Sequence, residues 1–291
     1  MTKYKISGHI KEQGYDGLST MKILIADPAK NITVFVLDPV NDPDRRTDLV
    51  RRIMADSRIK AEQVGFVLPP SADTLTACSD TALWHLEMAG GEFCGNATRS
   101  FGLYVARLLG FDGRTGFSVS VSGAARPVQV EVETREGWAS AEMPRPAVVE
   151  TLDFKNRPLP LLVFDGITHV IVPDLHPEKD VFCAIMSLAE EKLPAPAAFG
   201  VMFYETGSRF MRPLVYVRSV NTLVAESSCG SGSAALGIWL SRDIENGAAN
   251  YAIKQPGGII ETEVVKKAGK VISVTIGGKV DLGEPEEYPL L

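Results

Sequence analysis

Two cysteines of this 291-residue chain occupy the same place in two related segments. Residues 94–104 read Cys-Gly-Asn-Ala-Thr-Arg-Ser-Phe-Gly-Leu-Tyr, and residues 229–239 read Cys-Gly-Ser-Gly-Ser-Ala-Ala-Leu-Gly-Ile-Trp. After Cys-Gly, both share a hydroxyl residue, a small residue, an apolar residue and a glycine in the same order, then an aliphatic and an aromatic residue. Because the segments lie 135 positions apart (229 − 94), close to half the chain, they indicate an internal repeat with one thiol in each copy.

Each Cys-Gly pair is predicted to begin a helix. A helix N-terminus presents unpaired backbone N–H groups and the positive end of the helix dipole, so it can bind a carboxylate and favours a thiolate. We therefore expect both cysteines to have a lowered pKa and raised reactivity. We call each cysteine together with the helix start that follows it a head. The small residues that expose the amides are Gly95, Asn96 and Ala97 at the first head and Gly230, Ser231 and Gly232 at the second.

Two such heads facing one α-amino acid would carry out a specific reaction. One of Cys94 and Cys229 would remove the Cα proton as a general base, and the other, as a thiol, would return a proton to the opposite face. The amides would stabilise the charge that moves onto the carboxylate. The sequence shows no pyridoxal phosphate lysine motif, Walker A loop or dinucleotide Gly-x-Gly-x-x-Gly, so no cofactor is expected. Which thiol acts on which enantiomer stays open.

The other two cysteines, Cys78 and Cys183, lack this context and are predicted to be structural. Four cysteines are too few for a disulfide scaffold in a chain of this length, and their spacing matches no zinc pattern. No metal site is therefore expected.

The composition is that of a globular protein with a sizeable core. Hydrophobic residues make up 45%, and the net charge is −6. No long basic run suggests a nucleic-acid partner, and no signal peptide or membrane-spanning run is visible. We expect a cytoplasmic protein with no membrane or nucleic-acid partner and a small-molecule amino acid as substrate.

Apolar periodicity predicts an α+β chain in two halves of similar content. The Pro-rich residues 143–146 form the most linker-like stretch between them. Helices are predicted at 44–56, from 95 to a stop at 110, at 178–191 and from 230 to about 243. Strands are predicted at 21–27, 33–38, 64–68, 82–88, 116–121, 128–133, 161–164, 168–172, 200–204, 212–217, 258–265 and 271–276.

The chain resembles the diaminopimelate epimerase family, and most closely its branch of cofactor-independent histidine racemases. The resemblance rests on residues 62–66, 91–98, 228–232 and 255–258, which follow in the family's order over nearly the whole chain. It implies two pseudo-symmetric domains, each a barrel-like, mostly antiparallel sheet around a central helix. The domains would be 1–146 and 147–278, with a C-terminal strand at about 279–291 packing back on the first. The resemblance also makes a homodimer possible.

The resemblance assigns roles to individual residues. Cys94 and Cys229 match the acid/base pair. Glu62 matches a glutamate that the racemase branch uses near the substrate, and His169 lies where many members have a histidine beside the site. The residues that match the cradle for the carboxylate and amino groups are Gly95, Asn96, Gly230 and Ser231.

Two departures from the family bear on the substrate. Residues 220–226 contain no arginine where the epimerase clamps the distal carboxylate, so diaminopimelate is not expected. The usual N-terminal Gly-Asn is absent from residues 15–21, where Thr20 stands in place of a substrate-contacting asparagine. Histidine is favoured, and another amino acid, such as a diamino acid, stays open.

Three other functions remain open. A proton-shift isomerase of a small carboxylic acid would need the same cradle but no ammonium site, and the carboxylates of Glu62 and Glu226 argue against it. A redox dithiol formed by the paired thiols is the second alternative, and the absence of Cys-x-x-Cys argues against it. A non-catalytic amino-acid-binding protein would have little use for two reactive thiols.

Overall fold

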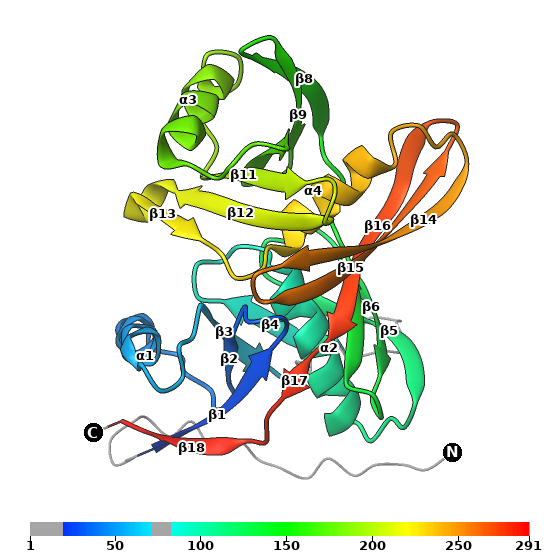
Figure 1. Ribbon diagram of the computed structural model, residues 1–291. Coiled ribbons are helices and arrows are strands. Elements are labelled where there is room, and N and C mark those ends of the chain that lie inside the picture. Colours follow the sequence, from blue (N-terminus) through cyan, green and yellow to red (C-terminus); the bar gives the residue numbers. More distant parts are fainter. Residues whose placement is uncertain (1–19, 71–82, 291) are drawn as a thin grey trace.

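The structure is a computed structural model that describes residues 20–70 and 83–290. Over these residues, 18 strands and four α-helices form a sheet-dominated α+β fold, which confirms the predicted class. Figure 1 shows two lobes, with α1 and α2 in the lower one and α3 and α4 in the upper one. Cys78 lies outside the described residues. Within them, no helix is long and apolar enough to cross a membrane.

The lower lobe is a sheet that curves around helix α2 (Gly95–Leu108). Its strands pair in the order β1–β2–β3–β4–β5–β6–β7, with parallel pairs at β2/β3 and β4/β5 and antiparallel pairs elsewhere. Helix α1 (Pro43–Ala55) lies outside it against β3. The strands are β1 (Thr20–Asp27), β2 (Thr33–Val36), β3 (Gln63–Leu68), β4 (His85–Met88), β5 (Arg114–Val121), β6 (Val128–Glu133) and β7 (Trp138–Glu142).

The upper lobe contains the same series of strand pairings. The order is β9–β10–β11–β12–β14–β15–β16, again parallel at the second and fourth pairs. Helix α4 (Gly230–Leu240) packs against β10, β11, β14, β15 and β16, whereas α3 (Lys179–Glu190) packs against β8 and β11. The strands are β8 (Val148–Phe154), β9 (Arg157–Val163), β10 (Ile167–Pro173), β11 (Ala198–Glu205), β12 (Phe210–Val217), β13 (Thr222–Ala225), β14 (Gly247–Gln255), β15 (Gly258–Lys267) and β16 (Lys270–Lys279).

Two sets of strand contacts join the lobes. β16 pairs antiparallel with β7, with Thr275 opposite Glu142, so the two sheets are continuous. The chain then returns to the lower lobe, where β17 (Asp281–Leu282) and β18 (Glu286–Pro289) pair antiparallel with β1. These crossings fix how the two central helices approach one another.

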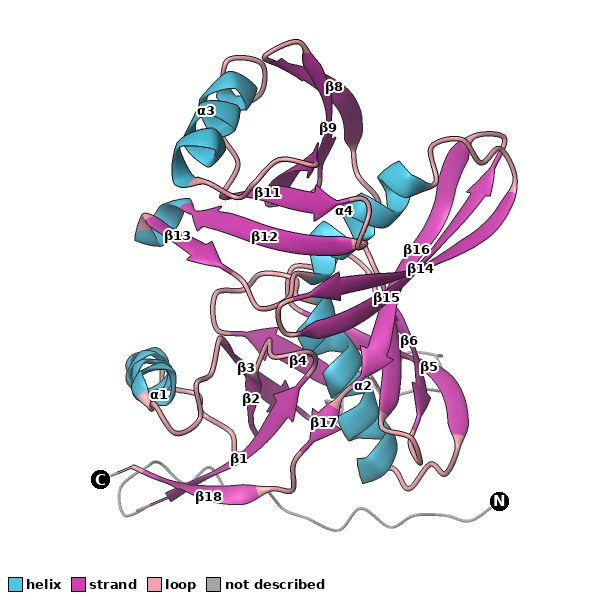
Figure 2. Ribbon diagram, in the orientation of Figure 1, coloured by secondary structure: helices cyan, strands magenta, loops and turns pink. Residues whose placement is uncertain are grey.

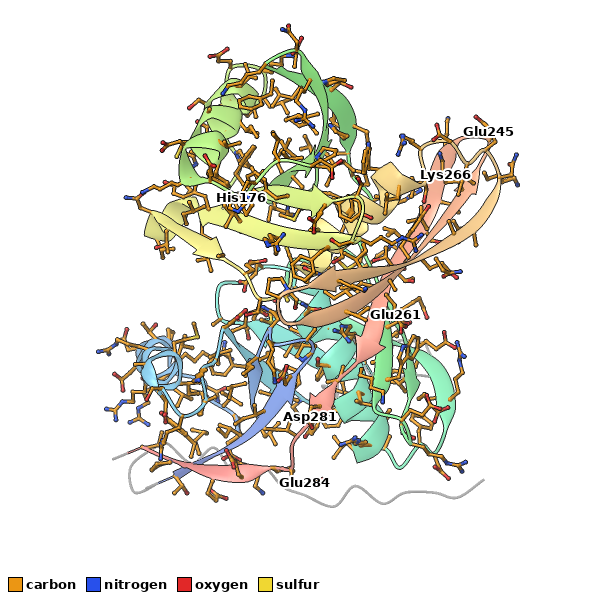
Figure 3. The ribbon with its side chains drawn as sticks, viewed as in Figure 1. His176, Glu245, Glu261, Lys266, Asp281 and Glu284 are labelled. Atoms are coloured by element: carbon orange, nitrogen blue, oxygen red, sulfur yellow. The ribbon has the colours of Figure 1, made fainter. Side chains whose placement is uncertain are left out.

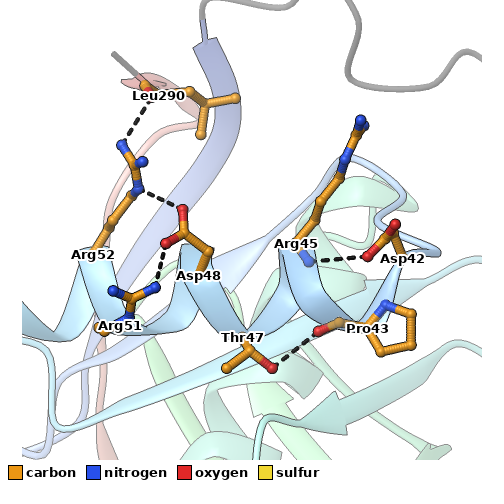
Figure 4. A network of polar contacts seen from close by, with 8 residues as sticks. All are labelled: Asp42, Pro43, Arg45, Thr47, Asp48, Arg51, Arg52 and Leu290. Carbon is orange, nitrogen blue, oxygen red and sulfur yellow. Dashed lines mark hydrogen bonds and ion pairs between the residues drawn. The ribbon is translucent and has the colours of Figure 1, made fainter.

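Figure 4 shows how α1 is held at its start and along its length. The Asp42 carboxylate caps the helix by accepting from the backbone N–H of Arg45 at 3.1 Å. Near the other end, Arg52 Nη1 donates to the Leu290 carbonyl at 2.9 Å. This bond ties α1 to the C-terminal segment that covers β1.

The two central helices are buried because their residues are small or apolar on most sides. In α2, Phe101 and Leu103 are completely buried, and in α4 the residues from Gly232 to Ile238 are all buried. Phe101 also meets the ring of Phe35 edge-on, with ring centroids 6.1 Å apart. The positions of both helix starts are therefore set by core packing.

We predict that Phe101→Ala lowers the free energy of unfolding by about 3–5 kcal/mol, because it opens a cavity beside α2. Phe111→Ala is the control. The Phe111 side chain is 43% exposed, so its removal should lower the free energy of unfolding by about 1 kcal/mol or less. Urea unfolding measures both. Equal losses for the two variants would contradict a core built on α2.

Candidate active site

Cys94 and Cys229 are the N-cap residues of α2 and α4. Their backbone angles nearly coincide, with φ −125°, ψ 114° at Cys94 and φ −120°, ψ 113° at Cys229. The Cys94 sulfur accepts from the amide of Ala97 at 3.4 Å, and the Cys229 sulfur accepts from the amide of Gly232 at 3.4 Å. Each thiol therefore lies against the open amides of its own helix.

The shared hydroxyl residue of the repeat fixes each head in the same way. Thr98 Oγ1 donates to the Cys94 carbonyl at 2.7 Å, and Ser233 Oγ donates to the Cys229 carbonyl at 2.7 Å. The repeat seen in the sequence thus corresponds to a repeated local structure around each thiol.

The two heads meet where glycine leaves room for them. A methyl group on Gly230 would lie 2.7 Å from Ile276 Cδ1 and 3.6 Å from the backbone nitrogen of Asn96. A methyl group on Gly95 would lie 2.8 Å from the same Ile276 carbon and would collide with Met143. Figure 2 shows α2 and α4 approaching one another between the lobes. Two thiols from opposite halves of the chain are thereby brought to one region.

A chain of polar side chains leads from the first head to the second half of the protein. Asn96 Nδ2 donates to Asn31 Oδ1 at 3.1 Å, and Asn31 Nδ2 donates to Glu62 Oε2 at 2.6 Å. Glu62 also hydrogen-bonds to the Ser227 side chain, two residues before Cys229. Glu62 therefore bridges the two heads.

The second head has its own set of partners. Glu226 hydrogen-bonds to the Cys229 side chain. Gln255 Oε1 accepts from the Cys229 backbone N–H at 2.8 Å, while Gln255 Nε2 donates to Ser233 at 2.9 Å. A side chain on Gly257 would collide with the Ala29 carbonyl, so the turn after Gln255 packs closely on the lower lobe.

His169 reaches the second thiol through one intermediate. Its Nε2 lies 2.9 Å from Ser231 Oγ, and Ser231 Oγ lies 3.6 Å from the Cys229 sulfur. The imidazole is completely buried, and burial lowers its pKa to about 3. His169 is therefore neutral, and its contact with the site runs through Ser231.

The pKa values of both thiols differ from the expectation. The pKa of Cys94 is raised to about 11, and that of Cys229 is raised well above its usual range. Hydrogen bonds from the Ala97 and Gly232 amides do lower the two pKa values, as a helix N-terminus should. Burial outweighs them because it removes water from the charged form, so the prediction of lowered thiol pKa values is wrong.

The two carboxyl groups at the site also hold protons more tightly than usual. Burial, with a smaller contribution from the charge on Glu62, raises the pKa of Glu226 to about 7, although a hydrogen bond with Cys229 opposes the rise. Burial likewise raises the pKa of Glu62, while hydrogen bonds from Asn31 and Ser227 oppose the rise. Two partly desolvated acids thus share one region, where a cationic group would stabilise both carboxylates.

The structure brings together nearly all the residues singled out from the sequence, and Thr20 is the exception. Thr20 lies opposite Pro289 at the start of β1, seven residues and roughly 23 Å from the Asp27 end that leads to Asn31. Asn31 is the asparagine that contacts the head, and the sequence argument sought it too early in the chain. Its signal was an asparagine two residues before the buried strand β2.

Two further residues beside the first thiol were missed. The Gln63 side chain hydrogen-bonds to the Cys94 thiol. The carbonyl oxygen of the same side chain, Gln63 Oε1, is buried and has no hydrogen-bond partner. Arg99 is completely buried behind the same head. In the described part of the chain, no cluster of three or more His, Cys, Asp or Glu residues could hold a metal ion.

Comparison with known proteins places this geometry among enzymes. The family described as histidine racemase CntK N-terminal domain matches residues 20–284. A histidine racemase of Fusobacterium nucleatum subsp. nucleatum is 32% identical over 270 residues, which cover 89% of this chain and 95% of that protein. A histidine racemase of Staphylococcus aureus is 27% identical over 242 residues, covering 80% and 85% of the two chains.

Solved structures share the fold. A predicted epimerase from Pseudomonas aeruginosa superposes with a TM-score of 0.64 at 14% identity, over 93% of this chain and 99% of that one. A probable proline racemase from Agrobacterium radiobacter K84 superposes with a TM-score of 0.63 at 16% identity, over 94% of each chain. At these identities the likeness concerns the fold.

We predict that iodoacetamide modifies Cys94 in the folded protein about 200-fold more slowly at pH 8 than in the unfolded chain. A pKa of about 11 leaves roughly one thiol in a thousand ionised at pH 8, against about one in four for an ordinary cysteine. Peptide mass spectrometry follows each thiol, with the exposed Cys183 as the internal reference. Because only the unfolded chain loses this proton above about pH 8.5, stability should also fall as the pH rises toward 11. Equal rates for folded and unfolded Cys94 would contradict the raised pKa.

Proposed function

This chain belongs to the histidine racemase family, and we propose that it interconverts L- and D-histidine by moving the Cα proton between Cys94 and Cys229 without a cofactor. The observation that carries this mechanism is the meeting of two cysteine-capped helix starts, one from each half of the chain, at Gly230 and Asn96. Two such groups on opposite sides of a carbon atom allow one to remove a proton from one face while the other returns a proton to the opposite face.

The substrate carboxylate would bind at the two helix starts. Their first amides lack partners within the helix and carry the positive end of the dipole. Asn96 and Gly230 face each other there, so one carboxylate can accept from both heads. The same N–H groups would stabilise the negative charge that moves onto the carboxylate when the Cα proton leaves.

The substrate ammonium would bind at Glu62 and Glu226. Both carboxyl groups are desolvated and have raised pKa values, so each gains from a neighbouring cation. Glu226 also touches Cys229, which places the ammonium site directly beside one of the two thiols. A substrate without an amino group would leave these two acids without a cationic partner, which argues against the isomerisation of a simple carboxylic acid.

Proton transfer then proceeds in two movements. The ionised thiol of one cysteine takes the Cα proton and becomes a thiol, leaving a carbanion whose charge spreads into the carboxylate. The thiol of the other cysteine gives its proton to the opposite face and becomes a thiolate. Product release leaves the two cysteines with exchanged protonation states, ready for the opposite enantiomer.

Histidine is proposed over other amino acids for two reasons. The relatives that span most of the chain are histidine racemases. In addition, residues 220–226, which include β13, hold no arginine for the distal carboxylate of diaminopimelate. A diamino acid remains the second substrate to test.

The repeated series of strand pairings supports an arrangement in two pseudo-symmetric domains. The proposed bounds are 1–146, together with the returning segment 279–291, and 147–278. A homodimer and a cytoplasmic location also stay predictions, and sedimentation analysis of the purified protein would test the first of these.

We predict that Cys94→Ser and Cys229→Ser each slow racemisation of histidine by roughly 100- to 10,000-fold, because each removes one of the two proton-transfer groups. NMR in deuterium oxide follows loss of the Cα–H signal, and chiral chromatography follows inversion. Each variant should retain exchange with one enantiomer at most. Cys183→Ser is the control, since its exposed thiol lies on α3 away from both heads. Parent-like racemisation by both site variants would refute the mechanism.

We further predict that Glu62→Gln raises the KM for histidine at least tenfold, since it removes a charge that would bind the substrate ammonium. Glu150→Gln removes an equivalent charge from an exposed position on β8 and should leave KM unchanged. Steady-state kinetics in both directions provide the measurement. An unchanged KM for Glu62→Gln would place the ammonium elsewhere.

A further inference from the structure

Arg99 is a buried cation immediately behind the first head. It lies on α2, five residues after Cys94, and its side chain is completely buried. Its Nε donates to Asn96 Oδ1 at 3.2 Å, and its Nη1 donates to the carbonyls of Gly278 at 2.9 Å and Lys279 at 3.3 Å. All three acceptors are neutral, and Nη2 has no hydrogen-bond partner.

A buried guanidinium without a countercharge is costly, so the nearby acidic groups matter. No described carboxylate forms an ion pair with Arg99. Burial lowers its pKa only to about 10, so it stays charged at neutral pH. The strongest influence that favours this charge is Cys94, followed by Glu261. Glu261, labelled in Figure 3, is exposed on β15 and accepts from Trp138 Nε1 at 2.8 Å, so water screens its charge.

The second head lacks this cation although the repeat is otherwise close. The residue five places after Cys229 is Ala234, where the first head has Arg99. Three places before Cys229 stands Glu226, where the first head has Gly91. The two thiols that look equivalent in the repeat therefore have different charged residues around them.

The groups that face each thiol reinforce the difference. At Cys94, the Gln63 side chain hydrogen-bonds to the sulfur and favours its ionised form, while the charge of Glu92 opposes it. At Cys229, the charge and hydrogen bond of Glu226 both oppose ionisation, and Ser231 favours it. Cys94 is also partly exposed, whereas Cys229 is buried.

From this arrangement we infer that Arg99 is a positioning residue that supplies the countercharge for a Cys94 thiolate, so that Cys94 ionises before Cys229 in the free protein. This inference rests on the proposed two-thiol racemase. As the pH rises, Cys94 is the first of the two thiols to lose its proton to solvent, and Cys229 keeps its own. In the first turnover Cys94 is therefore the base and Cys229 is the acid.

Titration of the two thiols tests the order directly. The protein is labelled with [3-¹³C]cysteine in a Cys78→Ser, Cys183→Ser background, and NMR follows both Cβ signals between pH 7 and 11. The expected result is that the Cys94 signal moves toward its thiolate position at lower pH than the Cys229 signal. If Cys229 moves first or together with Cys94, the inference is overturned, whatever the Arg99 variants do.

Variants of Arg99 test its role in that order. Arg99→Gln should raise the Cys94 midpoint and leave the Cys229 midpoint unmoved, because it removes one nearby positive charge. Arg99→Lys should restore most of the shift, since it keeps the charge. Arg107→Gln is the matched control on the same helix, because Arg107 Nη1 also donates to a C-terminal carbonyl, that of Leu282 at 3.2 Å. If the Cys94 midpoint changes by the same amount in Arg99→Gln and Arg99→Lys, in proportion to the loss of folding stability, Arg99 is a structural anchor and the inference is overturned.

Racemisation measured on the same samples separates this inference from the proposed function. Racemisation of histidine by a protein in which Cys229 ionises first would contradict only the inferred role of Arg99. Ionisation of Cys94 before Cys229 in a protein that does not racemise histidine would contradict only the proposed function.

Discussion

The close contact between two helix starts is the constraint on which the site depends. Gly95 and Gly230 both abut Ile276, and a side chain at either position would push the heads apart. The helices reach this contact because each is buried in its own sheet, and the β7/β16 pairing makes the two sheets continuous. The glycine after each cysteine therefore serves two purposes. It opens the helix amides to a ligand, and it lets the two halves approach closely enough to share one.

Burial of the two helix starts makes their thiols harder to ionise. The amides that stabilise a thiolate are present at both heads, yet desolvation raises both thiol pKa values and those of Glu62 and Glu226. The same low-dielectric surroundings strengthen every interaction with a bound zwitterion, whose carboxylate and ammonium match the amides and the two acids. The site is thus poor at holding isolated charges and well suited to holding a complementary set of them.

The sequence predicted the parts of this structure that are determined locally. The helices at Gly95 and Gly230 followed from their heads and apolar runs, and the buried strands followed from residues such as those of β11. β14 was missed because Gly-Ala-Ala-Asn-Tyr-Ala-Ile-Lys-Gln has little strand propensity, and pairing with β15 along its whole length makes it a strand. Asn31 was missed for a similar reason, since its role depends on which end of β1 faces the heads. The thiol pKa values depended on burial, which a helix-terminus argument leaves out.

The differences between the two halves are as informative as the repeat. A racemase with two thiols must pass through a state with one proton on the pair, and identical surroundings would leave that proton equally shared between them. In this chain the heads match in backbone geometry and hydroxyl anchors, while the charged residues around them differ: Arg99 and Gln63 lie beside Cys94, and Glu226 lies beside Cys229. Symmetry of the backbone places both sulfur atoms for a reaction that must run in both directions. Asymmetry of the buried charges decides where the proton rests between turnovers, and it does so without moving either sulfur.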